Sequence, residues 1–353
     1  MHRAKASPVM STSARAPRVA RGLARVASAR VAGPRGFATG DNDDGPTPRI
    51  PHRVAHPREQ HPADADDTPG SIFRNSVANK TGLSHALDAV MREGHHDMRA
   101  FGRGTLAALA SRAAYARFTA VHFHFYSELE RRLDDAARGP NPTPTGLVWR
   151  AFSEDLRRAP ALERDLVLLL DTTPSAHPVS PATAAYMRAI ASAAEREASS
   201  CSAESGGGAM PALLAHFYTR YLADLFGGSM LGWPTRRALG FATTPQFYVH
   251  DALEGGPARA RADYVERVYE AINDIGARVS DAAAAETVEE ARRAFAANAA
   301  VFAEGGGSSL LRATVGGARV MGGYAAERIW GAREQRDLFG RLVKRRDPDT
   351  GEF

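Results

Sequence analysis

Residues 213–231 combine ionisable side chains and glycines at helical spacing. His216, Arg220 and Asp224 follow one another at intervals of four residues, so an α-helix would place them on one face. An imidazole, a guanidinium and a carboxylate gathered on one face can exchange protons or hold a polar ligand. The alternative is an ordinary helix with a surface ion pair between Arg220 and Asp224, and the spacing alone favours neither interpretation.

The same stretch reaches two adjacent glycines, Gly227 and Gly228. Within a helix each glycine costs about 1 kcal/mol relative to alanine. Such a cost is expected if the helix simply ends there, or if a large ligand must lie against bare backbone. Both interpretations remain open from the pattern.

The elements that must position these residues are helices. Helical periodicity begins at Thr81, where Leu83, Leu87, Met91 and His95 form one stripe, and no segment alternates like a strand. We therefore predict an all-α domain over residues 76–305. The further helices are expected at about 102–110, 111–137, 148–158, 161–170, 181–197, 209–226, 260–280 and 285–304.

The ends of the chain differ from this body. Residues 1–40 contain seven arginines, Lys5 and no acid, which predicts an organelle transit peptide, with a mitochondrion favoured and a plastid as the alternative. Residues 41–75 contain six prolines and clustered aspartates, which is typical of a disordered linker. Residues 306–353 are glycine-rich and then charged, and they are expected to form a tail without a membrane anchor.

Charge and composition exclude several classes of protein. Outside residues 1–40 the chain has 37 basic and 40 acidic residues, so its body gives no reason to expect a nucleic-acid partner. A single cysteine, Cys201, excludes a disulfide framework, and it is expected in an exposed loop at 199–208. No apolar run approaches the roughly 20 residues of a membrane helix.

Three separated segments resemble the heme oxygenase family. The run Ala215-His-Phe-Tyr-Thr-Arg-Tyr-Leu-Ala-Asp-Leu-Phe-Gly-Gly228 is similar to the family signature. Phe152–Leu166 is similar to the middle helices of the family, and Ala294-Phe295-x-x-Asn298-x-x-x-Phe302 to its last core helix. The resemblance covers about residues 83–304, in the right order and at the right distances.

The resemblance implies a single-domain helical fold that holds heme between a proximal helix and a kinked distal helix. It also implies an enzyme that uses O2 and electrons to open heme, which is both substrate and cofactor, to biliverdin, iron and carbon monoxide. The family delivers protons through a distal water network. The residues at matching positions are Tyr126, Arg220, Asp224 and Asn298, and those implied to contact heme are Tyr218, Gly227, Gly228, Phe295 and Arg267.

Counting along the match places the iron ligand of the family on His95. Periodicity agrees, because His95 continues the apolar stripe of Leu83, Leu87 and Met91, whereas His96 falls on a more polar face. A neutral imidazole is a normal axial ligand of heme iron. We therefore expect His95 to bind the iron, with His96 as the alternative.

The chain departs from the family at positions near the two heme propionates. Asp88 stands where the proximal helix of the family has a base, and Glu266 or Arg267 takes the late basic position. Acids there would repel the propionates unless Arg92, Arg267 or Tyr218 compensates. Ala223 stands where the distal helix of the family has glycine.

Two hypotheses follow. The first is a soluble, monomeric organellar heme oxygenase whose electrons come from a soluble donor such as a ferredoxin or a reductase. The second is a catalytically degenerate member of the fold that serves as a scaffold or binds a partner. The Tyr126, Arg220, Asp224 and Asn298 set favours the first, whereas Asp88 and the sequence after His95 favour the second.

Overall fold

Helices make up every regular element in the described part of the chain, and no strand occurs there. The computed structural model describes residues 76–93, 98–202, 209–225, 229–250, 258–304 and 309–330. The elements are η1 (Ala78–Lys80), α2 (Gly82–Glu93), α3 (Met98–Ala108), α4 (Arg112–Ala137), α5 (Pro144–Leu156), α6 (Ala159–Leu170), η3 (Pro174–Ala176), α7 (Pro181–Ser202), α8 (Ala212–Phe217), η4 (Tyr218–Leu222), α9 (Ser229–Leu239), η6 (Gln246–Tyr248), α10 (Ala258–Gly276), α11 (Asp281–Phe302) and α12 (Leu310–Trp330).

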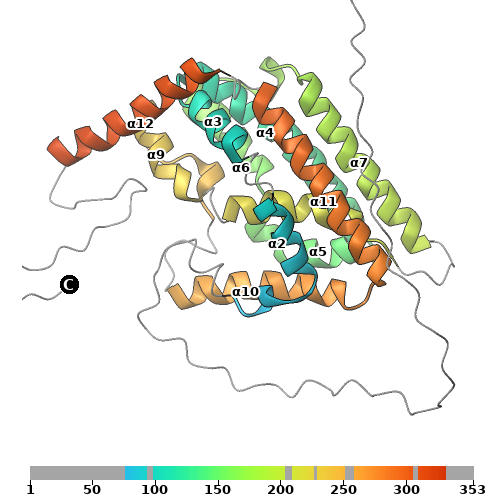
Figure 1. Ribbon diagram of the computed structural model, residues 1–353. Helices are drawn as coiled ribbons and strands as arrows, with labels where there is room; N and C mark the ends of the chain where they lie inside the picture. Colours follow the sequence, from blue (N-terminus) through green and yellow to red (C-terminus); the bar gives the residue numbers. More distant parts are fainter. Residues whose placement is uncertain are drawn as a thin grey trace, which may run out of the picture. The chain divides into compact units, whose positions relative to one another are not determined.

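The prediction of an all-α fold is confirmed, and the long helix expected at 111–137 is α4. Ser111 begins α4 by accepting a hydrogen bond from the Ala114 amide. Its inward face is fully buried at Phe125, Tyr126 and Leu129. In Figure 1, α7 and α11 run beside one another near α4, and α5, α6 and α7 all pack on α4. This helix is therefore the centre of the core.

Side chains of α10 fix the start of α2. The Glu266 carboxylate accepts hydrogen bonds from the Val77 and Ala78 amides at 3.1 and 2.6 Å. The Asn273 amide accepts from Ser84 N at 2.9 Å and donates to Ala78 O at 2.7 Å. These bonds satisfy amides that the first turn of a helix leaves without partners. As a result α2 is held against α10, as Figure 1 shows.

Several predictions fall on residues outside the described part, and they stay predictions. They concern the leader at 1–40, the linker at 41–75, the tail after residue 330, and His95, His96, Gly227 and Gly228. Cys201 is exposed as expected, but it lies in the last turn of α7 rather than in a loop.

The sequence predicts that the domain ends at residue 305, but helix α12 follows that point. It packs on α3 and α9 (Figure 1), so the helical body extends further than periodicity indicates. Its four glycines, Gly316, Gly317, Gly322 and Gly323, lower helix propensity and hide the helix from a pattern search. Gly316 permits the contact, because a Cβ atom there would overlap the carbonyl oxygen of Leu106 on α3.

Among the described residues, no helix has both the length and the apolar character needed to cross a membrane.

We predict that Gly316→Ala loosens α12 from α3 and lowers the free energy of unfolding by about 1–3 kcal/mol, because the added methyl group meets backbone that cannot move aside. Gly317→Ala is the matched control, since nothing lies within 4 Å of its Cβ position. It should leave stability unchanged or raise it slightly. Denaturant unfolding of both variants measures the difference, and equal stabilities would contradict the close contact.

Candidate functional site

The guanidinium of Arg220 joins the four predicted distal residues into one cluster. Its Nε and Nη2 donate to the Tyr126 hydroxyl at 3.3 and 3.2 Å, and its Nη1 donates to Asn298 Oδ1 at 3.2 Å. Nη2 also lies 3.5 Å from Asp224 Oδ1, while the Tyr126 hydroxyl donates to Asp224 Oδ2. Helix α4, the η4 segment and α11 thus bring together residues that are up to 172 positions apart in the chain.

The cluster is buried and its charges are matched. Arg220 and Asp224 are 5% and 7% exposed. Burial raises the pKa of Asp224 above its ordinary value, and the positive charge of Arg220 opposes this rise without cancelling it. Burial also raises the pKa of Tyr126 well above its ordinary value, so its hydroxyl keeps its proton. The Arg220 guanidinium lies over the Phe125 ring, 4.8 Å from its centroid, which adds a cation–π contact.

A π-helical turn places Arg220 in the cluster. The chain is α-helical to Phe217 and then π-helical from Tyr218 to Leu222. A π-turn is wider than an α-turn and rotates the residues after it relative to those before it. His216 is one turn before Arg220 and, like Arg220, bonds to α11, but it is not part of the cluster. Its Nε2 lies 3.1 Å from Glu290 Oε1.

The opposite side of η4 faces α2 and α10 through Tyr218. This side chain is fully buried, and its hydroxyl lies next to the hydroxyl of Tyr269 on α10. Burial, Tyr269 and Asp88 together raise its pKa well above the ordinary value. The hydroxyls of Tyr218 and Tyr269, together with Asp88, are polar groups that fit the edge of a heme between α2 and η4, where the resemblance places it.

The acids that depart from the family pattern both have partners in this protein. Asp88 is 3.2 Å from Arg92 Nη1, one turn along α2. The Glu266 carboxylate accepts hydrogen bonds from the Val77 and Ala78 amides at the start of η1, so it has a structural role. Arg92 therefore offsets the charge of Asp88, as the sequence allows.

Arg267 and Phe295 were also predicted to contact heme, and their contacts in the described part of the chain are with aromatic rings. Arg267 is exposed and lies over the Tyr264 ring, 5.6 Å from its centroid. Phe295 is buried on α11, and its ring meets Phe101 of α3 edge-on at 5.1 Å. Ala223 is half-buried between η4 and Asp224.

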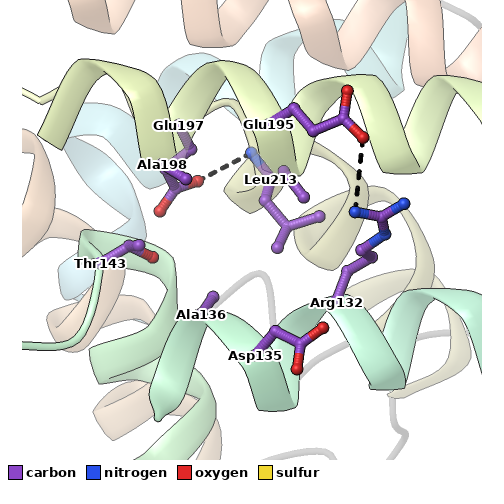
Figure 2. Close-up of a pocket in the computed structure, with 9 residues that line it drawn as sticks. Arg132, Asp135, Ala136, Thr143, Glu195, Glu197, Ala198 and Leu213 are labelled. Carbon is purple, nitrogen blue, oxygen red and sulfur yellow. Dashed lines mark hydrogen bonds and ion pairs between the residues drawn. The ribbon is translucent and has the colours of Figure 1, made fainter. Parts of the chain in front are cut away.

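Glu197 of α7 fixes the start of α8, which carries the chain into the site. This buried carboxylate accepts hydrogen bonds from Leu213 N at 2.9 Å and from the amide and hydroxyl of Thr145 at 2.9 and 2.8 Å. Figure 2 shows the Leu213 bond at the edge of a pocket of about 170 Å³. None of the four clustered residues lines this pocket, so the pocket lies outside the Arg220 cluster. The Glu197 carboxylate joins α7 to α5 and α8.

Sequence reasoning did not single out His122, a buried histidine of α4 whose Nδ1 lies 2.8 Å from the carbonyl oxygen of Phe118. It lies four residues before Tyr126, one helical turn along the same face. That spacing is the signal that could have found it.

Comparisons with known proteins agree with the resemblance. The family model described as heme oxygenase matches residues 81–304. Heme oxygenase 1 of Rattus norvegicus is 28% identical over 234 residues, which cover 63% of this chain and 71% of the relative. Heme oxygenase of Rhodella violacea is 29% identical over 208 residues, or 58% and 77% of the two chains.

Solved structures show the same fold. Heme oxygenase-2 from Synechocystis sp. PCC 6803, in complex with heme and NO, matches with a TM-score of 0.53 and 21% identity over 74% of this chain and 98% of that one. Heme oxygenase 2 from Chlamydomonas reinhardtii, without heme, matches with a TM-score of 0.52 and 20% identity over 63% and 97%. The family match spans most of the helical body, and the fold agrees with it. The chain therefore belongs to the heme oxygenase family.

Proposed function

We propose that the protein is an active heme oxygenase, which opens heme to biliverdin and releases iron and carbon monoxide with the use of O2 and a reduced electron donor. The observation that carries this proposal is the buried cluster of Tyr126, Arg220, Asp224 and Asn298. A scaffold protein has no use for such a cluster, because burying a charged network costs free energy. Family membership supports the same function.

When bound, heme supplies the iron that reacts with O2 and the ring that is opened. The protein supplies an ordered path for protons. The two Asp224 oxygens accept from Tyr126 and Arg220, which fixes the orientation of the carboxylate. A fixed carboxylate accepts hydrogen bonds from water and so orients that water for proton transfer. Arg220 keeps its positive charge and holds the carboxylate in place.

The amide of Asn298 is also fixed at both ends. Its Nδ2 donates to Ala294 O at 2.9 Å, and its Oδ1 accepts from Arg220 at 3.2 Å. Its place on α11 therefore limits how far Arg220 can move. Tyr126 limits the same guanidinium from α4.

The heme itself would lie against α2 and the Tyr218 side of η4, with His95 as the expected iron ligand. Arg92, which pairs with Asp88, is the base nearest to the expected propionate position on α2. We also propose that the protein acts in an organelle matrix, with a mitochondrion favoured and a plastid as the alternative. Its electrons would come from a soluble donor such as a ferredoxin.

Hemin titration tests the function directly. The purified protein should form a 1:1 complex with a histidine-ligated Soret spectrum, and with a reductant and O2 it should yield biliverdin. Absence of a tight complex would favour the alternative, a degenerate member that acts as a scaffold or binds a partner.

We predict that Asp224→Asn lowers biliverdin yield by about 10²-fold or more, because the fixed carboxylate is lost. Hemin affinity should change little, since Asp224 is not expected to ligate iron. Asp135→Asn is the control, because Asp135 forms only exposed ion pairs with Arg131 and Arg138. Normal yield with reduced thermal stability in Asp224→Asn would remove Asp224 from the reaction and leave it a structural role.

The raised pKa of Asp224 predicts a pH dependence. Because burial raises this pKa and Arg220 only partly opposes the rise, the carboxylate is protonated at higher pH than an ordinary aspartate. Activity that needs the ionised carboxylate should therefore fall as pH decreases through this raised pKa. Single-turnover yield measured against pH should show this acid limb in the native protein. A similar limb in Asp224→Asn would assign it to another group.

We predict that His95→Ala abolishes the histidine-ligated spectrum and leaves the helical content unchanged, because His95 continues the stripe of Leu83 and Leu87, both buried on α2. His96→Ala is the paired variant and should keep the spectrum. Absorption and circular dichroism spectra of the two variants give the answer, and the reverse result would move the ligand to His96.

A further inference from the structure

The side of α12 that faces away from α3 and α9 carries large apolar side chains exposed to solvent. Leu310 and Leu311 are 70% and 75% exposed, and Val315 and Met321 are exposed as well. At α-helical spacing these four residues fall on one side of the helix, which we call the α12 face. Single exposed apolar residues need no explanation, but a group of them on one face marks a place where something binds.

The α12 face offers a partner almost no hydrogen-bonding groups. Its other exposed positions are Thr314, Ala318 and Gly322. The Thr314 hydroxyl donates to Leu310 O at 2.9 Å, so it is already used within the helix. Interfaces between proteins carry about one hydrogen bond per 100–200 Å², whereas the acyl chains of a lipid need none. The composition of the face therefore favours lipid over a protein partner.

Arginines border the α12 face on the side of α9. Arg319 donates through Nε to Ala238 O of α9 at 2.9 Å, and Arg312 is exposed two turns before it. Arg237 of α9 lies beside Gly323, where a Cβ atom would be 3.1 Å from the Arg237 Cβ. Among the side chains of α3, α9 and α12 that the structure describes there are five arginines and no acid: Arg103, Arg236, Arg237, Arg312 and Arg319.

An apolar helix face bordered by arginines is typical of a helix that lies in the interface of a bilayer. The apolar side chains enter the boundary between headgroups and acyl chains, while the guanidinium groups stay at the level of the phosphates. Because anionic lipids give a membrane a negative surface potential, the arginines favour membranes that contain them. A helix that binds in this way does not span the bilayer.

We propose that the α12 face docks the protein on an anionic lipid surface, with Leu310, Leu311, Val315 and Met321 in the interface and Arg312 against the phosphates. Helix α12 is already packed on α3 and α9, so binding does not have to order it first. The inference goes beyond the proposed function and does not depend on heme.

Flotation of the full chain with lipid vesicles tests the docking. Vesicles of phosphatidylcholine with phosphatidylglycerol should carry the protein with them, and vesicles of phosphatidylcholine alone should carry much less. Added salt should weaken the binding, because it screens the attraction between arginines and lipid phosphates. No binding to the mixed vesicles would overturn the proposal.

The apolar contribution is tested with Leu311→Gln, because residues 1–40 are also basic and would draw the full chain to anionic vesicles by charge alone. This variant should bind the mixed vesicles at least about tenfold more weakly, since a leucine side chain no longer leaves water. Leu168→Gln is the matched control, because Leu168 is 74% exposed on α6 and lies outside the α12 face. It should bind as the native protein does.

Equal vesicle affinities of these two variants would overturn the proposal. Both variants should keep the melting temperature and the helical content of the native protein, since both side chains are exposed.

The charge contribution is tested with Arg312→Gln. Loss of one arginine near the lipid phosphates should weaken binding about fivefold and make it less sensitive to salt. An affinity and a salt dependence equal to those of the native protein would contradict the assignment of an anionic surface.

A second copy of the chain is the other occupant that these variants can reveal. Sedimentation velocity without vesicles should give the same mass for the native protein and for Leu311→Gln. A native dimer that Leu311→Gln separates into monomers would assign the α12 face to self-association and overturn the lipid proposal.

Discussion

Burial of the Arg220 charge is the constraint on which the site depends. A guanidinium that is 5% exposed has lost its water and must find acceptors in the protein. Its acceptors come from three places, Tyr126 on α4, Asp224 after η4 and Asn298 on α11. Because removing one partner leaves a buried charge uncompensated, the relative positions of these helices are tied to the same interaction that orients the distal carboxylate.

Buried carboxylates set the frame around this interaction. Glu130 of α4 accepts from the Arg158 and Ala159 amides at the start of α6. Asp165 of α6 accepts from the amides of Gln246 and Phe247, which holds the Phe247 ring beside His122. Each acid binds the first amides of another helix, where partners are missing. The walls of the site are therefore located by side chain to backbone bonds between elements distant in the chain.

The sequence predicted the helices that have a clear apolar stripe, and the spacing of Arg220 and Asp224 together with the unusual Asn298 indicated the cluster. It did not predict the π-turn at Tyr218–Leu222, because no residue type in that stretch distinguishes a π-turn from an α-helical turn. Buried acids such as Glu266 have the same pattern as surface charges, and only their partners in the fold distinguish them.

Glu266 also limits how this protein can change. Glu266→Lys would place a positive charge near the expected propionate position. Comparison with the family pattern would suggest this exchange as a way to raise the affinity for heme. The same exchange would remove the acceptor for Val77 and Ala78 and place a cation against two amide donors. A change of residue 266 to the basic residue of the family would therefore destabilise the start of the domain. A basic residue introduced on the exposed side of α2 would not have this cost in stability.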